Sequence, residues 1–162
     1  MIKPKFRFNR ITDISGDFLK ENGIKNIILD IDNTLTYHDS QEISECVLDW
    51  ISERKKDGIG LVLLSNNNHD RVYPFAERIG LEFVPSAAKP LTKGYKRLLS
   101  RFNWKREETA SIGDQLFTDM LGANLTGVIS ILVEPFHKEK GRLLRFKRVM
   151  EELILKEKRN YD

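Results

Sequence analysis

Four short hydrophobic runs recur along the chain, and each is continuous rather than alternating with polar residues. The runs are NIILDI (26–31), GLVLLS (60–65), TASIG (109–113) and VISILV (128–133), and LEFV (81–84) is a shorter fifth candidate. Continuous apolar strands are covered by other elements on both faces, which is typical of a parallel sheet. We therefore predict buried parallel strands at these five places.

A helix is predicted after the first run, in the segment EISECVLDWISERKKDG (42–58). Its apolar residues recur with helical spacing, at Ile43, Val47, Trp50 and Ile51. Asp39 and Glu42 resemble a capping box at its start, and Gly58 ends it.

Two more helices are predicted between the later runs. Residues 92–102 form one, with Thr92 placed to cap it. The other contains Pro74, which fits only the first turn of a helix, so this helix either starts near Arg71 or kinks.

The alternation of strands and helices predicts an α/β fold: a doubly wound, Rossmann-like parallel sheet flanked by helices. We see no linker, so residues 1–162 are expected to form a single domain with a core at about 24–135. A basic helix is predicted at about 138–159, either closing the sheet or meeting anionic lipid or an acidic partner.

Composition and charge narrow the class of protein. No stretch approaches the roughly 20 apolar residues of a membrane span, and the N-terminus lacks the apolar segment of a secretory signal, so we expect a cytoplasmic protein. The single cysteine, Cys46, excludes an internal disulfide, and the three histidines are too scattered for a zinc cluster. Residues 1–10 carry four basic and no acidic side chains, while 138–159 carry nine basic and four acidic ones.

Polar residues follow nearly every predicted strand. The segments are Asp30 to Thr34, then Ser65 and Asn66, then Lys89 and Pro90, then Gly113 and Asp114, with Asp119 five residues on. Ligands of open α/β sheets bind beyond the carboxyl ends of the strands, so we expect these groups to meet at one edge.

Several carboxylates at one edge repel one another unless a cation lies between them. Mg²⁺ prefers oxygen ligands and is often shared between carboxylates and a phosphate group of the substrate. A lysine and a serine hydroxyl suit the remaining phosphate oxygens. The set therefore predicts phosphoryl transfer, with Asp30 as the nucleophile that forms an aspartyl-phosphate and Asp32 as the general acid and base.

The segments DIDNTL, LLSNN, AKP and GDQLFTD, in this order, resemble the four motifs of the haloacid dehalogenase (HAD) superfamily of phosphohydrolases. The resemblance covers roughly residues 26–133 and implies a Rossmann-like sheet. It implies Asp30 as nucleophile and metal ligand, and Asp32 as acid and base with its backbone carbonyl on the metal.

The same resemblance implies roles for the later motifs. Ser65 and the Asn66 amide bind phosphate, and Lys89 bridges the nucleophile and the phosphate. Asp114 is a metal ligand, and Asp119 holds a water on the metal, which is Mg²⁺. A calcium loop does not explain Asp30 and Asp32, because Leu35 stands where that loop needs glycine and Gln41 where it needs glutamate.

Only 35 residues separate Asp30 from Ser65 and 24 separate Ser65 from Lys89, so no cap domain is expected and the site should be open. The chain is similar to the capless subclass IIIA group called YqeG-like, which is related to phosphatidylglycerophosphate phosphatases. That resemblance implies a phospholipid head-group phosphate as substrate. Together with the open site and the basic ends, it leads us to expect a peripheral position at the inner face of the membrane.

Two alternatives remain open at this point. One is a capless phosphatase acting on nucleic-acid ends or phosphoprotein, although we do not expect nucleic acid as a partner. The other is a phospho-switch like a response-regulator receiver, but there the phosphoacceptor aspartate lies on a middle strand. The sequence does not indicate an oligomeric state.

Overall fold

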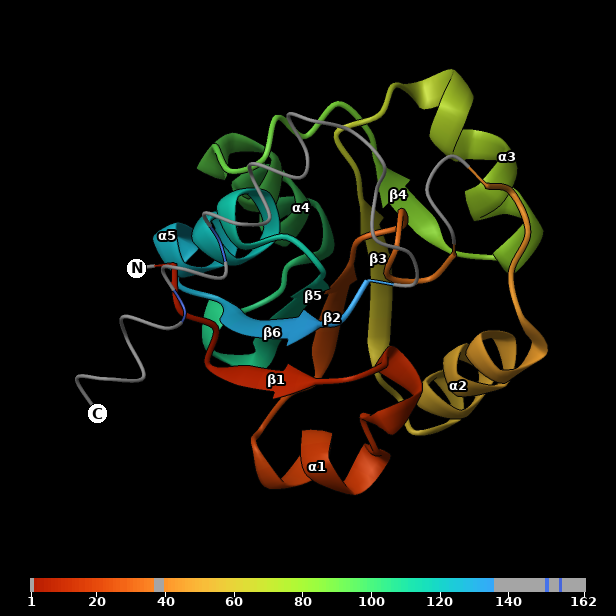
Figure 1. Ribbon diagram of the computed structural model, residues 1–162, viewed down its shortest axis with the longest axis horizontal. Coiled ribbons are helices and arrows are strands. Elements are labelled where there is room, and N and C mark those ends of the chain that lie inside the picture. The colour runs from red at the N-terminus through yellow and green to blue at the C-terminus, as the bar shows by residue number, and fades with distance from the viewer. Residues whose placement is uncertain (1, 37–39, 136–150, 152–154, 156–162) are drawn as a thin grey trace.

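The computed structural model describes residues 2–36, 40–135, 151 and 155, and its six strands form one parallel sheet. The strands are β1 (Phe6–Phe8), β2 (Asn26–Leu29), β3 (Gly60–Leu64), β4 (Glu82–Val84), β5 (Thr109–Gly113) and β6 (Ile129–Val133). Their order across the sheet is β1-β6-β5-β2-β3-β4 (Figure 1). All five predicted strands are confirmed, each within two residues of its predicted bounds.

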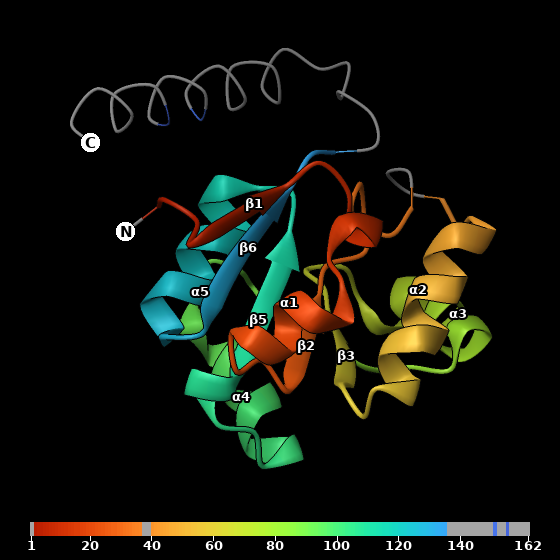
Figure 2. The same cartoon turned by 90° about the horizontal axis from the view of Figure 1, so that it is seen from below.

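Helices cover both faces of the sheet (Figure 2). They are α1 (Gly16–Glu21), α2 (Glu45–Lys56), α3 (His69–Ile79), α4 (Thr92–Phe102) and α5 (Leu121–Thr126). Two 3-10 turns (Ile11–Asp13 and Arg106–Glu108) and a π-helical turn (Leu116–Met120) complete the elements.

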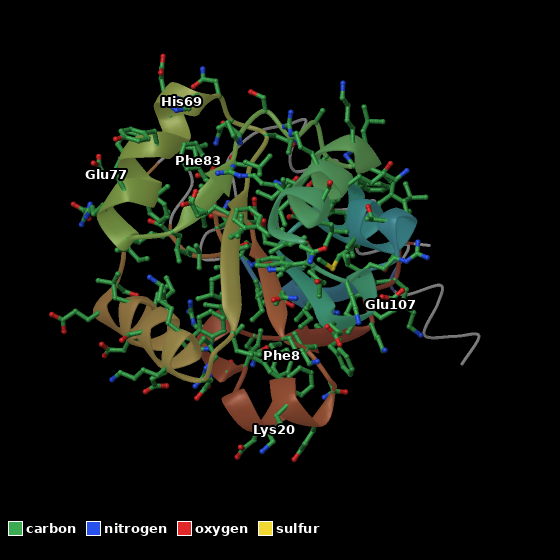
Figure 3. The ribbon with its side chains drawn as sticks, turned by 180° about the vertical axis from the view of Figure 1, so that it is seen from behind. Phe8, Lys20, His69, Glu77, Phe83 and Glu107 are labelled. Carbon is green, nitrogen blue, oxygen red and sulfur yellow. The ribbon has the colours of Figure 1, made fainter. Side chains whose placement is uncertain are left out.

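Successive residues of β2 point to opposite faces, which explains why its apolar run is continuous. Ile27 and Leu29 belong to the buried cluster that contains residues of α1, α2 and α3, whereas Ile28 belongs to the cluster on the side of α4 and α5. On the first of these faces, His69 at the start of α3 lies beside Phe83 of β4, with ring centroids 5.4 Å apart (Figure 3). The doubly wound α/β architecture is therefore confirmed.

The central position of β2 decides where chemistry can occur. Leu29, the last residue of β2, pairs with Leu63 of β3 on one side and Ile112 of β5 on the other. The chain proceeds from β2 outward through β3 to β4 and then returns to β5 and β6 on the opposite side. The strand order thus reverses beside β2, and the carboxyl edge there is the expected ligand site of such a sheet.

The start of α2 differs from the prediction. The helix begins at Glu45 with Ser44 as its N-cap, so Glu42 and Ile43 precede it, and Asp39 lies outside the described residues. The backbone oxygen of Glu42 accepts a hydrogen bond from the Thr36 hydroxyl. This contact holds the segment before α2 against the loop after β2, which is why the helix starts later than its apolar spacing indicates.

The predicted starts of the other two helices also shift. In α4 the N-cap is Leu91, so Thr92 is the first helical residue rather than the cap. In α3 the N-cap is Asn68, and the helix begins at His69, two residues before the expected start. Pro74 therefore lies in the second turn, where the helix loses one backbone hydrogen bond.

The sequence prediction missed β1 and α1. β1 pairs with β6 at the edge of the sheet, and Ile11, Ile14 and Leu19 are fully buried in the core. The sheet therefore begins at Phe6, before the core predicted at about 24–135. The predicted C-terminal helix, 138–159, lies outside the described residues except for positions 151 and 155.

Candidate active site

The residues predicted to carry chemistry follow four neighbouring strands at the carboxyl edge of the sheet. Asp30 follows β2, Ser65 follows β3, Lys89 lies after β4, and Asp114 follows β5. The backbone N–H of Asp30 still pairs with the carbonyl of Ile112, so the end of the central strand fixes this carboxylate. Parallel strands all deliver their carboxyl ends to the same edge, which is why residues up to 84 positions apart meet there.

Three carboxylates converge at this edge. Asp30, Asp114 and Asp119 each offer an oxygen, and these oxygens all lie within 4.8 Å of one another. Asp114 and Asp119 are each only 2% exposed, whereas Asp30 is half-buried. Hard oxygen donors this close fit a divalent cation such as Mg²⁺, because without one they repel each other. The structure thus places Asp119 in the same cluster as Asp30 and Asp114.

Lys89 connects two of these carboxylates. Its Nζ atom lies 3.0 Å from Oδ1 of Asp30 and 2.6 Å from Oδ1 of Asp119. Burial alone would lower the pKa of Lys89, but the negative charges of Asp119 and Asp30 outweigh it and raise the pKa well above its ordinary value. The lysine is therefore a fixed positive charge beside the predicted nucleophile.

The buried position of Asp119 disfavours its negative charge. Burial, followed by the negative charge of Asp30, raises the pKa of Asp119 to about 6. The backbone N–H of Gln115 donates to Oδ2 of Asp119, which orients the carboxylate toward Lys89. One lysine for three carboxylates leaves an excess of negative charge, which a divalent cation would offset.

Asn66 has a different contact from the one the sequence prediction used. Its side-chain oxygen accepts a hydrogen bond from the backbone N–H of Lys89 at 2.7 Å, and its side-chain nitrogen donates to the Lys89 carbonyl at 3.1 Å. The side chain thus fixes the loop that carries Lys89. The predicted phosphate contact is made by the backbone amide of Asn66, and it stays a prediction.

Asp32 has two partners that the sequence prediction missed. Asn67 donates from Nδ2 to Oδ2 of Asp32 at 3.0 Å, and Nη2 of Arg71 lies 3.6 Å from Oδ1 of the same carboxylate. The Ser65 hydroxyl accepts a hydrogen bond from the backbone N–H of Asn67, so Ser65 and Asp32 are joined through one residue. Asn67 follows Asn66 directly, and Arg71 lies in the first turn of α3. Neither spacing indicates from the sequence alone a contact with Asp32.

The loop after β2 is shaped by a left-handed residue. Asn33 has φ of 60°, a conformation that asparagine tolerates better than most residues. The turn allows the Thr34 hydroxyl to donate to Oδ2 of Asp30 at 3.3 Å. Both oxygens of Asp30 are therefore engaged, one by Lys89 and one by Thr34.

The described residues contain no inserted cap over this edge. Between Asp30 and Ser65 they form α2 and β3, and between Ser65 and Lys89 they form α3 and β4. Within the same described residues, no helix is long and apolar enough to cross a bilayer.

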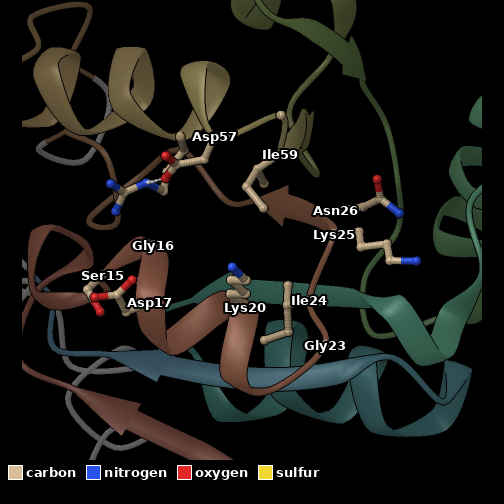
Figure 4. Close-up of a pocket in the computed structure, with 12 residues that line it drawn as sticks. Ser15, Gly16, Asp17, Lys20, Gly23, Ile24, Lys25, Asn26, Asp57 and Ile59 are labelled. Carbon is tan, nitrogen blue, oxygen red and sulfur yellow. Dashed lines mark ion pairs between the residues drawn. The ribbon is translucent and has the colours of Figure 1, made fainter.

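A hollow of about 970 Å³ lies at the opposite edge of the sheet, between α1, α2 and the start of β2 (Figure 4). Two of its charged side chains pair with each other, since Nε of Arg54 lies 2.9 Å from Oδ2 of Asp57. Its lining comes from the amino ends of the strands, so the carboxylate cluster remains the candidate for catalysis.

Comparison with known proteins shows the family of the chain. Residues 1–135 match the sequence model of a family described as mitochondrial PGP phosphatase. The chain is 40% identical over 145 residues to YqeG, a probable phosphatase of Bacillus subtilis, covering 90% of this chain and 84% of that protein. It is 28% identical over 166 residues to phosphatidylglycerophosphate phosphatase 1, chloroplastic/mitochondrial, of Arabidopsis thaliana, covering 96% of this chain but only 47% of that protein.

Solved structures share the fold at low sequence identity. A 4-nitrophenylphosphatase of Thermotoga maritima gives a TM-score of 0.62 at 14% identity, covering 76% of this chain and 91% of that one. The cobalt-bound deoxy-D-mannose-octulosonate 8-phosphate phosphatase of Haemophilus influenzae gives 0.56 at 18% identity, covering 70% of each chain.

Proposed function

Because the chain belongs to the family described as mitochondrial PGP phosphatase, we propose that it removes the terminal phosphate of phosphatidylglycerophosphate in an Mg²⁺-dependent reaction. The chain is a phosphatase of the HAD type. The observation that carries the proposed mechanism is the contact of Lys89 with both Asp30 and Asp119, with Asp114 in the same cluster.

In the proposed first step, a carboxylate oxygen of Asp30 attacks the phosphorus. A bond between that oxygen and phosphorus forms, and the bond from phosphorus to the glycerol oxygen breaks. Asp32 donates a proton to the departing oxygen. Lys89, the Ser65 hydroxyl and the Asn66 backbone amide bind the phosphoryl oxygens and stabilise their negative charge.

In the second step, Asp32 takes a proton from a water molecule that attacks the aspartyl-phosphate. The bond between phosphorus and Asp30 breaks, which releases inorganic phosphate and restores the free carboxylate. Asp30, Asp114 and the Asp32 backbone carbonyl would hold Mg²⁺, and Asp119 would hold a water on the cation. When bound, the cation offsets the charge that would otherwise repel an attacking carboxylate.

Loss of the nucleophile gives the direct test of the mechanism. Asp30→Asn keeps the size of the side chain but cannot form the acyl phosphate, so we expect phosphate release to fall by about a thousandfold or more. The matched control is Asp49→Asn, an equal change on the exposed face of α2, which should retain wild-type activity. The nucleophile assignment is wrong if Asp30→Asn retains a substantial fraction of the Mg²⁺-dependent rate.

The substrate is tested separately, with mixed liposomes that contain phosphatidylglycerophosphate. The full chain should release phosphate from this lipid faster than from 4-nitrophenyl phosphate, and EDTA should abolish both reactions. Equal rates on the two substrates would contradict the lipid assignment while leaving the phosphatase activity intact.

A further inference from the structure

Arg71 lies beside the predicted acid and base of the reaction. Its Nη2 atom is 3.6 Å from Oδ1 of Asp32, and the two side chains are only 24% and 18% exposed. The backbone N–H of Arg71 donates to the side chain of Asn68, the N-cap of α3, at 3.0 Å. The first turn of the helix thus holds the guanidinium next to Asp32.

The contacts divide the site into two sides. Lys89, Asp114 and Asp119 gather around Asp30, where the phosphoryl group would bind. Asn67 and Arg71 gather around Asp32. Asp32 must reach the departing oxygen in order to protonate it, so its neighbours border the part of the substrate that leaves.

The positive charge of Arg71 suits a leaving group that is itself charged. Its side chain is only 24% exposed, and its distance of 3.6 Å from Asp32 is longer than a hydrogen bond. Solvent and salt therefore screen its charge less than they would on an open surface. A guanidinium that borders the departing part of the substrate attracts an anionic group there and gains little from an uncharged alcohol.

We propose that Arg71 forms a binding site for a second anion carried by the leaving group. The substrate class is then a phosphate monoester of an alcohol that bears a phosphodiester or a further phosphate a few bonds away. The planar fork of arginine binds such oxygens with two parallel hydrogen bonds. This inference rests on the proposed function, because phosphatidylglycerophosphate carries a phosphodiester on the glycerol that leaves.

Two water-soluble esters separate this site from membrane effects. Glycerol 3-phosphate has an uncharged leaving group, whereas glycerophosphoglycerophosphate, the deacylated form of the lipid, has an anionic one. We expect the wild-type chain to prefer the second ester, measured as the ratio of the two kcat/KM values. Arg71→Gln should reduce this ratio about ten- to a hundredfold, because one charge-assisted hydrogen-bond pair is lost.

Two further variants separate the proposed role from simpler ones. Arg71→Lys keeps the charge without the fork and should retain an intermediate preference. Arg78→Gln removes the same charge from the same helix, but Nη1 of Arg78 donates to the Gln41 carbonyl rather than facing Asp32. It should leave the ratio at its wild-type value. Circular dichroism and the unfolding midpoint check that each variant is folded.

The results that would refute the anion site differ from those that would refute the proposed lipid substrate. If Arg71→Gln lowers kcat/KM equally for both esters, Arg71 only orients Asp32 and the anion site is refuted. Equal wild-type kcat/KM values for the two esters, or a loss of preference in Arg78→Gln, also refute it. If the preference depends on Arg71 but the lipid in liposomes is not hydrolysed, the lipid assignment fails and the anion site stands.

Discussion

Gly113 ends β5 directly beside the carboxylate cluster, and its lack of a side chain makes room for Asp119. A Cβ atom placed on Gly113 would overlap the Asp119 carboxyl group. The overlap is with a buried group that is already held by Lys89 and Gln115, so it cannot move aside easily. The missing side chain at Gly113 therefore allows the Asp119 carboxylate to lie directly beside the end of β5.

Gly113→Ala should accordingly weaken both catalysis and metal binding. We expect kcat/KM to fall at least about tenfold, because displacement of a catalytic group by a fraction of an ångström is costly. The rise in melting temperature on adding Mg²⁺ should also shrink. The control is Gly16→Ala at the opposite edge, where the new Cβ would overlap the end of the flexible Asp57 side chain and lie in ordinary contact with Arg54. Wild-type activity in Gly113→Ala would contradict the role of this close approach.

The individual site residues were predictable to different degrees. Asp30, Ser65 and Asp114 follow apolar runs, so strand ends alone indicated where they would lie. Asn67 and Arg71 were missed because they meet Asp32 from just before the N-cap and from the first turn of a helix whose start was misplaced. Contacts of this kind depend on the direction of a helix relative to a strand, which no local spacing encodes.

Among the elements, continuous apolar runs predicted strands correctly even when they were short, whereas short elements without such a run were missed. α4 has the predicted bounds, 92–102, because its apolar face recurs over three turns. β1 and α1 have three and six residues, which is too short for a periodic pattern to emerge. The start of α2 was misplaced because Glu42 is held by a tertiary contact with Thr36, which overrides the apparent cap.

At Gly94 in α4, helix propensity and a tertiary contact predict opposite effects of substitution by alanine. Helix propensity alone predicts that Gly94→Ala stabilises the protein by about 1 kcal/mol. However, the new Cβ would lie 2.7 Å from the backbone oxygen of Ala87, in the loop that leads to Lys89. We expect the contact to prevail, so the variant should lose about 1–3 kcal/mol of unfolding free energy and some activity.

Chemical denaturation measures this effect, with Ser100→Ala as the control. Ser100 is exposed on the same helix, so alanine there should change the unfolding free energy by less than about 0.5 kcal/mol. A Gly94→Ala variant that is more stable than the wild type would mean that the Ala87 loop can move away without cost.

At the scale of the whole molecule, strand order and charge distribution act together. The reversal of strand order beside β2 creates one open edge, and the loops bring an excess of carboxylates to it. Basic residues instead concentrate at the two ends of the chain. Within the described residues no inserted cap lies over this edge to enclose a small substrate, so we expect a surface to supply part of the binding energy.

We therefore predict that the basic segment 138–159 contributes to binding of anionic vesicles. The test replaces four of its basic residues with glutamine, at Lys138, Lys140, Arg142 and Arg145. Each basic residue near an anionic surface is worth about 1 kcal/mol, so vesicle binding should fall at least about tenfold and become less sensitive to salt. Hydrolysis of glycerophosphoglycerophosphate in solution should change little, because the substitutions leave the carboxylate cluster intact.

A matched variant separates this segment from overall charge. It neutralises four exposed lysines elsewhere on the chain, at Lys20, Lys56, Lys96 and Lys105. Both variants have the same net charge, so a loss of vesicle binding confined to the first one assigns the effect to the segment. Equal losses would mean that total charge governs binding, and a parallel loss of soluble-ester hydrolysis in the first variant would mean that the segment supports the fold. Only a loss of vesicle binding confined to the first variant supports a role of segment 138–159 in bringing the site to a lipid surface.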